Sequence, residues 1–308
     1  MMNTDILLKN LESPKSGVDM IRDTDAFNEI DDQFAIAYMM RNTEKLNVRA
    51  IYAAPFHNSK STGPEDGMEK SYDEIIRLLS LLGRGDMNGQ VYKGAGNFLE
   101  DEQSPVASPA AKHLAEFAMN YTCEKPLYVA AIGAITNIAS AILINPQIID
   151  RIVIVWLGGH SFHWQDTKEF NLFQDVAAAR VIFGCGAPVV QLPCGGVVSA
   201  FTISGAEMEK WLLGKNELCD YLVRNSFEEV ASYASQQPWT RVIWDVTAVA
   251  WLVNSGFFEE RIEKSPIPGY DGFYSFDANR HPMKYVYNVR RDELVRDLFS
   301  KLARTEGL

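Results

Sequence analysis

The chain has few cysteines and no long apolar run. No two of its four cysteines have the Cys-x-x-Cys spacing of a zinc or redox site. Nothing approaches the run of about 18 apolar residues that a membrane-spanning helix needs, and the stretch before Pro14 lacks the apolar segment of a signal peptide. We therefore expect a cytoplasmic protein with reduced thiols and no membrane partner.

Basic residues are also scarce. The 29 lysines and arginines are outnumbered by 40 acidic residues, which gives a net charge of −11 and argues against a nucleic-acid partner. The apolar fraction of 47% is enough for a sizeable core. Because no repeat, low-complexity tract or long linker interrupts the chain, residues 1–308 are expected to form a single domain.

Strand-like and helix-like segments alternate along most of the sequence. Strands are expected near residues 18–21, 47–54, 91–93, 127–132, 152–157 and 188–192, and helices at 71–82, 109–121, 136–143 and 175–183. Such alternation predicts an α/β fold, a mostly parallel sheet with helices on both faces. The part after Gly195 is more helical and predicts a cap over the sheet, with irregular strands and loops at 265–287 and a closing helix at 292–304.

An acidic loop follows the first expected strand. Within ten positions it carries Asp23, Asp25, Glu29, Asp31 and Asp32, at the carboxyl end of a strand, where open α/β sheets place their ligands. Carboxylates this close repel one another unless they are neutralised, and a hard cation such as Ca²⁺ takes oxygen ligands. The alternative is a solvated loop whose last two acids favour a helix amino terminus.

Three further polar stretches follow later strands or open a helix. They are residues 132–137, residues 158–171 and Trp244-Asp245. In an extended segment Glu169 and Asn171 would face the same side, although loop solvation explains them equally well. An aspartate at a helix start is usually a cap, so Asp245 by itself is weak support for a site.

Taken in order, the four stretches resemble the nucleoside hydrolase family, the inosine-uridine-preferring N-ribohydrolases, over residues 18–303. The most specific parts are Asp-Thr-Asp…Asp-Asp, Gly-Ala-Ile-Thr-Asn-Ile-Ala, Gly-Gly followed by Glu-Phe-Asn…Asp-x-Ala-Ala-Ala, and the aspartate of Trp-Asp. The resemblance implies a Rossmann-like sheet, a tightly held Ca²⁺ and hydrolysis of the bond between ribose and base. The expected partner is a nucleoside or a related N-glycoside. We also expect a homo-oligomer, either a dimer or a tetramer.

The resemblance also implies roles for individual residues at the metal. Asp25 would bind Ca²⁺ and deprotonate the attacking water, and Asp32 would chelate the ion. The backbone carbonyl of Ile132 and the carboxylate of Asp245 would complete the protein ligands. Asp31 would hold the ribose hydroxyls.

On the sugar side, the resemblance implies that Glu169 and Asn171 hydrogen-bond the ribose hydroxyls. Asn58 falls loosely where the family has another sugar-contacting asparagine. His163 stands six residues before Glu169, where the family has an asparagine, and is the candidate to replace it.

Two other departures from the family concern the acidic loop and the leaving group. The loop is two residues longer, so that Asn28 and Glu29 either enter the pocket or form an outward bulge. Trp244 stands where many members have a proton-donating histidine, and a tryptophan there resembles the branch that prefers inosine, adenosine and guanosine. Stacking on an indole contributes about 0.5–1.5 kcal/mol, and its candidate partners are Trp156, Trp164, Trp239, Phe27 and His163.

The chemistry agrees with this assignment. Cleavage of an N-glycosidic bond builds positive charge on the sugar, which a carboxylate-rich pocket stabilises. We therefore predict a Ca²⁺-dependent hydrolase of ribonucleosides with a purine-like leaving group. One alternative is a metal-dependent phosphohydrolase, although that class needs a lysine at a later strand end, and the sequence offers no convincing one. The other is a non-catalytic nucleoside- or sugar-binding protein on the same scaffold.

Overall fold

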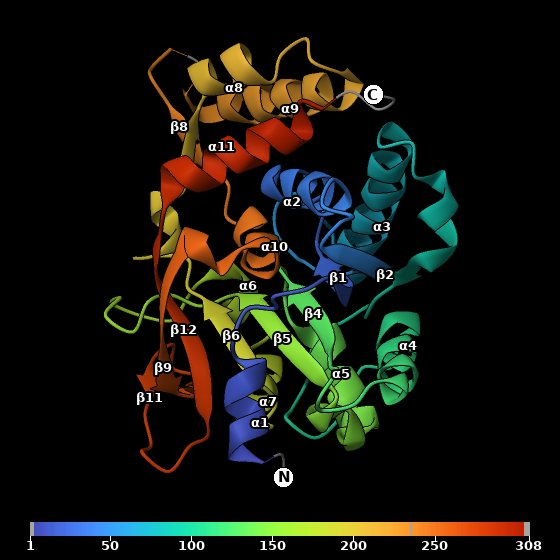
Figure 1. Ribbon diagram of the computed structural model, residues 1–308, viewed down its shortest axis with the longest axis vertical. Coiled ribbons are helices and arrows are strands. Elements are labelled where there is room, and N and C mark those ends of the chain that lie inside the picture. Colours follow the sequence, from blue (N-terminus) through green and yellow to red (C-terminus); the bar gives the residue numbers. More distant parts are fainter. Residues whose placement is uncertain (1–2, 235, 305–308) are drawn as a thin grey trace.

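The computed structural model describes residues 3–234 and 236–304 and is built around an eight-stranded sheet (Figure 1). The strand order is β3 (Val91–Lys93), β2 (Leu46–Ala53), β1 (Val18–Thr24), β4 (Leu127–Ala131), β5 (Ile152–Leu157), β6 (Val189–Leu192), β12 (Pro282–Val289) and β9 (Phe258–Lys264). β12 and β9 pair antiparallel, whereas the other neighbouring strands pair in parallel. The expected α/β fold with a mostly parallel sheet is confirmed.

Helices cover both faces of this sheet. On one face lie α2 (Asp31–Met40), α3 (Pro64–Leu81), α10 (Val246–Val253) and α11 (Arg291–Leu302), and on the other α4 (Pro109–Phe117), α5 (Thr136–Ile144) and α7 (Val176–Gly184). Alternate residues of β5 belong to two separate apolar clusters, one on each face. This burial on both sides explains its uninterrupted apolar sequence.

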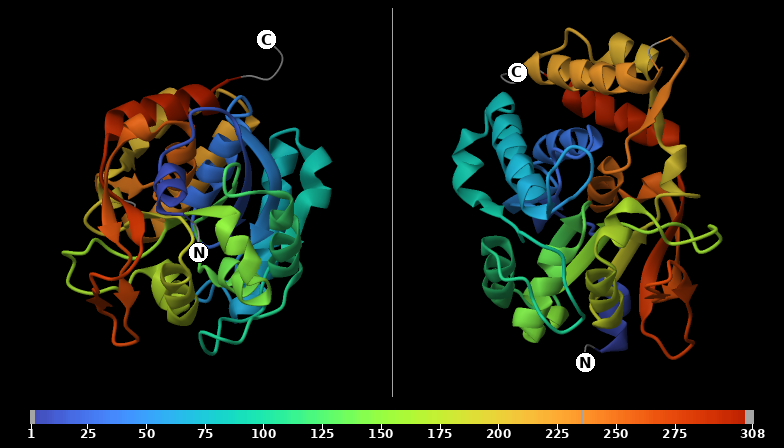
Figure 2. Two further views of the ribbon diagram at one scale, coloured as in Figure 1. Left: turned by 60° about the horizontal axis from the view of Figure 1, so that its bottom comes forward. Right: turned by 180° about the vertical axis from the view of Figure 1, so that it is seen from behind.

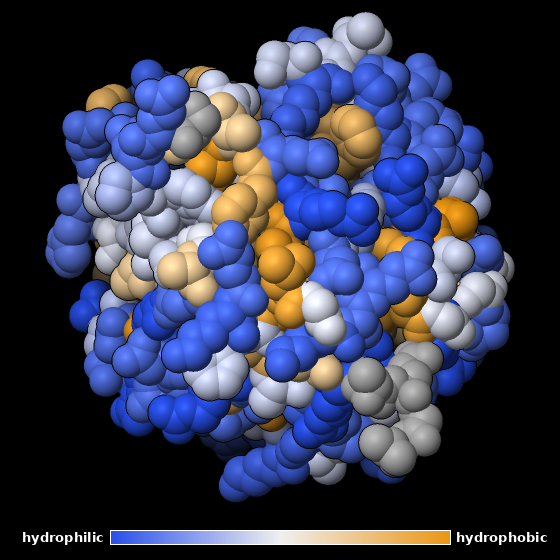
Figure 3. Space-filling model, turned by 90° about the horizontal axis from the view of Figure 1, so that it is seen from above, coloured by the Kyte–Doolittle hydropathy of each residue, from blue (hydrophilic) through white to orange (hydrophobic). Residues whose placement is uncertain are grey.

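A helical cap lies at one end of the molecule. α8 (Gly205–Trp211) and α9 (Glu217–Ala234) lie beyond α11 in the two opposite views of Figures 1 and 2. The small antiparallel pair β7 (Thr202–Ser204) and β8 (Thr240–Val242) flanks them, and Ser204 and Glu207 form a capping box at the start of α8. Hydrophilic side chains cover most of the face seen from this end (Figure 3).

The remaining elements are short. They are α1 (Thr4–Asn10), α6 (Phe170–Gln174), β10 (Ile267–Pro268), β11 (Tyr274–Ser275) and the 3₁₀ turns Gly85–Gln90, Ala118–Asn120, Pro146–Asp150, Val198–Ala200 and Ser255–Phe257. Within the described ranges, no helix is both long and apolar enough to cross a membrane.

The last part of the sheet differs from the expectation. Residues 265–287 were expected to form irregular strands and loops, but the regular strand β12 begins within them at Pro282 and continues to Val289. The unpredicted strand β9 pairs with it at the sheet edge. The sequence of β9, Phe-Glu-Glu-Arg-Ile-Glu-Lys, is mostly charged and half-exposed. Charged edge strands resist pairing with other chains, and they lack the apolar alternation by which a strand is recognised in sequence.

Candidate active site

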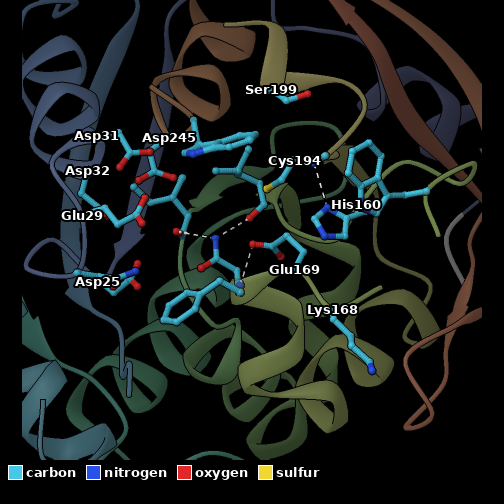
Figure 4. Close-up of a pocket in the computed structure, with 18 residues that line it drawn as sticks. Asp25, Glu29, Asp31, Asp32, His160, Lys168, Glu169, Cys194, Ser199 and Asp245 are labelled. Carbon is cyan, nitrogen blue, oxygen red and sulfur yellow. Dashed lines mark hydrogen bonds between the residues drawn. The ribbon is translucent and has the colours of Figure 1, made fainter. Parts of the chain in front are cut away.

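A cavity of about 350 Å³ opens at the carboxyl ends of the central strands (Figure 4). The chain winds in opposite directions on the two sides of the β1–β4 boundary, which makes this the switch point where α/β sheets bind ligands. All four polar stretches contribute to the wall. It is lined by Asp25, Asn28, Glu29, Asp31, Asp32, Ile132, Leu157, His160, Trp164, Lys168, Glu169, Phe170, Asn171, Cys194, Gly195, Ser199, Trp244 and Asp245.

Three carboxylates converge on one side of the cavity. One oxygen each from Asp31, Asp32 and Asp245 lies within 4.8 Å of the other two, and the three side chains are buried. The first two open α2, and Asp245 stands at the amino terminus of α10, which packs against α2. In the described chain the Asp245 side chain makes no capping hydrogen bond. Its carboxylate is therefore directed to the cluster rather than used as a helix cap.

Crowding and burial disfavour the charged forms of these groups. Burial, followed by the charge of Glu29, raises the pKa of Asp31 well above its usual range. Burial, followed by the charge of Asp31, does the same for Asp245. Burial also raises the pKa of Asp32 to about 6, although the Thr24 hydroxyl donates a hydrogen bond to this carboxylate and acts in the opposite direction. A bound cation would relieve this repulsion.

Asp25 lies apart from the three converging oxygens but faces the same cavity (Figure 4). Among the described residues, neither of its carboxylate oxygens has a hydrogen-bond partner, and the side chain is 1% exposed. It packs against Gly133, where an added Cβ would lie 2.8 Å from Asp25 Oδ1. Burial, followed by the charge of Asp32, raises the pKa of Asp25 well above its usual range.

The donor atoms fit a hard divalent cation. They are carboxylate oxygens, and Asp31 Oδ1 and both oxygens of Asp25 lack partners within the described chain. Ca²⁺ binds such oxygen-only sets. The carboxylates expected to bind the ion were those of Asp25, Asp32 and Asp245. The three carboxylates whose oxygens lie within 4.8 Å of one another include Asp31 in place of Asp25. The Ile132 carbonyl lies on the wall and accepts a hydrogen bond from Asn171 Nδ2 at 2.9 Å, which leaves its second lone pair for a ligand.

Glu169 and Asn171 both reach the cavity, and they do so from the start of a helix. Glu169 is the amino-terminal cap of α6 and accepts hydrogen bonds from the backbone N–H groups of Asn171 at 2.8 Å, Leu172 at 2.9 Å and Gly159 at 2.7 Å. The capping carboxylate thus starts a helix, which neither the extended segment nor the solvated loop considered from the sequence includes. Because Asn171 Nδ2 binds backbone carbonyls, its side-chain oxygen is left for a donor such as a sugar hydroxyl.

His163 and Asn58 are not among the residues that line the cavity. The loop turns at this point, with the Trp164 N–H donating to the Ser161 carbonyl at 2.9 Å, and leaves His163 exposed at the tip. His160 and Trp164 lie on the wall instead, with ring centroids 5.4 Å apart. Asn58 contacts the wall of the cavity through Asn28, because its Nδ2 donates to Asn28 Oδ1 at 2.6 Å.

The longer acidic loop contributes to the wall rather than bulging away from it. Asn28 and Glu29 both line the cavity. Arg241 Nη2, from β8, lies 2.7 Å from a Glu29 oxygen and 3.0 Å from a Glu229 oxygen of α9. The ion pairs tie the loop to the helical cap.

Trp244 lines the cavity, as does Trp164. The other aromatic candidates lie elsewhere: Trp156 is in the core against Phe183, and Trp239 packs on Phe227 in the cap. Sequence reasoning missed His160, Cys194 and a buried arginine, Arg22, beneath the acids. Of these three, only Arg22 could have been noticed in the sequence, as a basic residue that directly follows the apolar pair Met20-Ile21 in the first strand.

Comparisons with known proteins agree with this geometry. Residues 20–292 match the family model described as inosine-uridine preferring nucleoside hydrolase. The pyrimidine-specific ribonucleoside hydrolase RihA of Escherichia coli O127:H6 is 25% identical over 252 residues, covering 74% of this chain and 78% of that protein. RihA of Klebsiella pneumoniae strain 342 is 25% identical over 309 residues, covering 89% and 95%.

Among solved structures, the purine-preferring ribonucleoside hydrolase from Gardnerella vaginalis has a similar fold. The TM-score is 0.75 at 19% identity, over 92% of this chain and 98% of that one. The family match covers most of the chain and includes the acidic loop, the strand-end stretches and Trp244-Asp245. The chain therefore belongs to the inosine-uridine preferring nucleoside hydrolase family, which makes it an N-glycosyl hydrolase.

Proposed function

We propose that this protein uses a bound Ca²⁺ to hydrolyse the N-glycosidic bond of ribonucleosides, with a preference for purines, and releases free base and ribose. The observation that carries the proposal is the convergence of three buried carboxylates in a cavity of about 350 Å³. That volume is within the range of small-molecule sites, roughly 300–1,000 Å³. Asp25, Asp31, Asp32, Asp245 and the Ile132 carbonyl are the groups available to hold the ion.

Asp25 is the proposed general base. When bound, Ca²⁺ neutralises the carboxylates and lowers the pKa of a water molecule that it coordinates. Asp25 takes the proton of the attacking water, since both of its oxygens lack protein partners within the described chain. Burial raises the pKa of Asp25 above its usual range, which makes its carboxylate a stronger base.

The sugar is proposed to lie between the acids and the start of α6. The Asn171 side-chain oxygen and the oxygens of Asp31 and Glu169 accept hydrogen bonds from ribose hydroxyls. As the bond to the base lengthens, the sugar becomes positively charged. The acidic wall stabilises that charge, because its carboxylates are already in position.

The proposed purine preference rests on the aromatic wall. Trp244 and Trp164 both line the cavity, and a purine offers them a larger ring face than a pyrimidine. The relatives differ in this respect, because the RihA proteins are named pyrimidine-specific and the Gardnerella vaginalis enzyme purine-preferring. A homo-oligomer, dimer or tetramer, and a single domain over residues 1–308 also belong to the proposal.

A panel of nucleosides tests the activity. Inosine, guanosine, adenosine, uridine and cytidine are incubated with the Ca²⁺-loaded protein, and free base and reducing sugar are measured. We expect equal amounts of base and sugar, with inosine or guanosine giving the highest kcat/KM. Binding by calorimetry without release of base would favour the sugar-binding protein, and phosphate release from p-nitrophenyl phosphate would favour the phosphohydrolase.

The metal is tested separately. Protein purified without chelator is analysed for bound metals and then dialysed against chelator. We expect about one Ca²⁺ per chain, loss of activity on dialysis and recovery on adding Ca²⁺. Zinc in the preparation, or full activity after dialysis, would contradict this part of the proposal.

A further inference from the structure

A buried arginine lies directly beneath the acid cluster. Arg22 is on β1, with Ile51 of β2 and Ala130 of β4 beside it in the sheet. Both neighbours belong to the apolar core that α2 and α10 cover. Arg22 is 0% exposed, so a guanidinium occupies a position whose surroundings suit an aliphatic side chain.

Burial leaves the Arg22 guanidinium short of partners. Its Nη2 donates to the backbone carbonyl of Asp245 at 3.3 Å, while its Nε and Nη1 have no hydrogen-bond partner among the described residues. A buried charge without full hydrogen bonding is strongly unfavourable unless opposite charge lies nearby. The stability of the fold therefore requires a compensating charge close to Arg22.

The aspartates of the site supply that charge. The negative charges of Asp245 and Asp32 are the strongest that act on Arg22, followed by those of Asp23 and Asp25. Burial still outweighs them and lowers the pKa of Arg22 to about 10, so the guanidinium stays protonated at neutral pH. The hydrogen bond to the Asp245 carbonyl also joins Arg22 to the residue at the N-cap position of α10.

We propose that Arg22 is a built-in counter-cation of the acid cluster. This role rests on the cation site proposed above. Arg22 holds Asp32 and Asp245 in place when no metal is bound and weakens the affinity for Ca²⁺ by repelling the ion. It acts through these two aspartates and is a positioning residue rather than a catalytic one. The site consequently stays folded without metal and releases Ca²⁺ more readily than the same acids would alone.

Two substitutions separate the charge of Arg22 from its volume. Arg22→Met removes the charge and suits the apolar surroundings, whereas Arg22→Lys keeps the charge. Calorimetric titration with Ca²⁺ alone at pH 8 should give a Kd for Arg22→Met that is tighter than wild type by at least about tenfold. Arg22→Lys should stay close to wild type. A merely structural role for Arg22 would predict weaker binding in both variants.

Thermal unfolding supplies a second readout. Chelator should lower the Tm of Arg22→Met much more than that of the wild type, because tighter binding stabilises more. If Arg22→Met folds only when Ca²⁺ is present, that result also supports the proposal, because the variant is expected to depend on Ca²⁺ for its stability. Arg22→Lys should fold without Ca²⁺.

Lys284→Met is a matched control. Lys284 is also a buried cation of the sheet, but it lies on β12, four strands from β1, and pairs with Glu12 at 2.9 Å and Glu260 at 3.0 Å. Its loss should lower the Tm without changing the Kd for Ca²⁺.

The outcomes distinguish this role from the proposed function. Equal or weaker Ca²⁺ binding by Arg22→Met than by wild type would overturn the role of Arg22 and leave the cation site standing. If neither protein binds Ca²⁺, both proposals fail. Binding by Arg22→Met alone would support the role of Arg22 and contradict Ca²⁺ dependence of the wild type.

Discussion

The side-chain amide of Asn171 joins the start of α6 to the ends of two central strands. Its Nδ2 donates to the carbonyl of Ile132, just after β4, at 2.9 Å and to the carbonyl of Leu157, at the end of β5, at 3.1 Å. A single residue thus fixes two backbone segments of the cavity wall and offers its side-chain oxygen to the cavity. It contributes to the geometry of the site as well as to the proposed sugar contact.

Asn171→Ala should therefore lower stability as well as activity. The substitution leaves two buried carbonyls without their donor, which costs about 1–3 kcal/mol. We expect this loss in the free energy of unfolding measured with urea. Asn97→Ala is the control, since Asn97 is exposed and, among the described residues, its side chain bonds only the neighbouring Phe98 N–H. It should cost less than about 0.5 kcal/mol. Equal stability of the two variants would show that the Asn171 bonds contribute little.

Asp25→Asn should remove activity without unfolding the protein. Loss of a positioned general base lowers the rate by about 10²–10⁴-fold, and loss of a metal ligand adds to this. In metal-free protein the neutral amide replaces a buried carboxylate that has no hydrogen-bond partner in the described part of the chain, so the Tm should stay the same or rise. Initial rates with inosine and calorimetry measure the two effects. A variant with more than about a tenth of the wild-type rate would retain a base, and Glu29 would be the first carboxylate to test.

The metal-free protein should lose stability as the pH rises. Burial raises the pKa of Asp23 to about 7 and that of Asp32 to about 6, from an ordinary value of 3.8. Between about pH 4 and 7 the folded state therefore binds more protons than the unfolded state, and the free energy of unfolding falls with increasing pH.

Calorimetry of metal-free protein should show a Tm that decreases from pH 5 to pH 8 by this mechanism. Ca²⁺ binds the deprotonated carboxylates, so saturating Ca²⁺ should reduce the decrease. A Tm that rises over this range without metal would mean that these aspartates are ionised in the folded protein.

The sequence was most informative where local pattern and burial coincide. The apolar run of β5 is buried on both faces. The acidic stretch joins β1 to α2 at the carboxyl end of the strand, as its position predicted. The motifs identified the stretches that meet at the cavity. They did not predict that Asp31 would join Asp32 and Asp245, because that grouping depends on how α2 packs against α10.

The features that the sequence did not predict also depend on contacts between segments that are distant in the chain. β9 is a charged edge strand without alternation, and its place in the sheet depends on pairing with a distant segment, β12. Glu169 starts a helix because its carboxylate finds three backbone donors, one of them ten residues away at Gly159. Arg22 is buried next to Asp245, which is close to it in space but 223 residues away in the sequence. Single-sequence patterns carry no information on such long-range contacts.

Trp244 should determine the preference for the leaving base. It lines the cavity, and its backbone carbonyl accepts hydrogen bonds from the Thr247 N–H at 3.2 Å and Oγ1 at 2.7 Å, which holds it at the start of α10. The indole N–H donates a hydrogen bond but does not titrate near neutral pH, so it cannot relay a proton to the base. The departing base must then be activated by stacking and by solvent or another acid, and a purine has the larger ring face and a basic N7.

We therefore expect a higher kcat/KM for inosine or guanosine than for uridine, and a loss in Trp244→Ala that falls mainly on the purines. Trp244→Phe keeps a ring and should retain part of the purine rate. Trp211→Ala is the control, since Trp211 lies on α8 outside the cavity and is 54% exposed. It should leave the kcat/KM values for all substrates unchanged. An equal loss on every nucleoside in Trp244→Ala would mean that the indole only packs the wall, because selective activation by stacking must discriminate between ring sizes. A wild-type preference for uridine would show that the purine assignment is wrong, whatever the effect of the substitution.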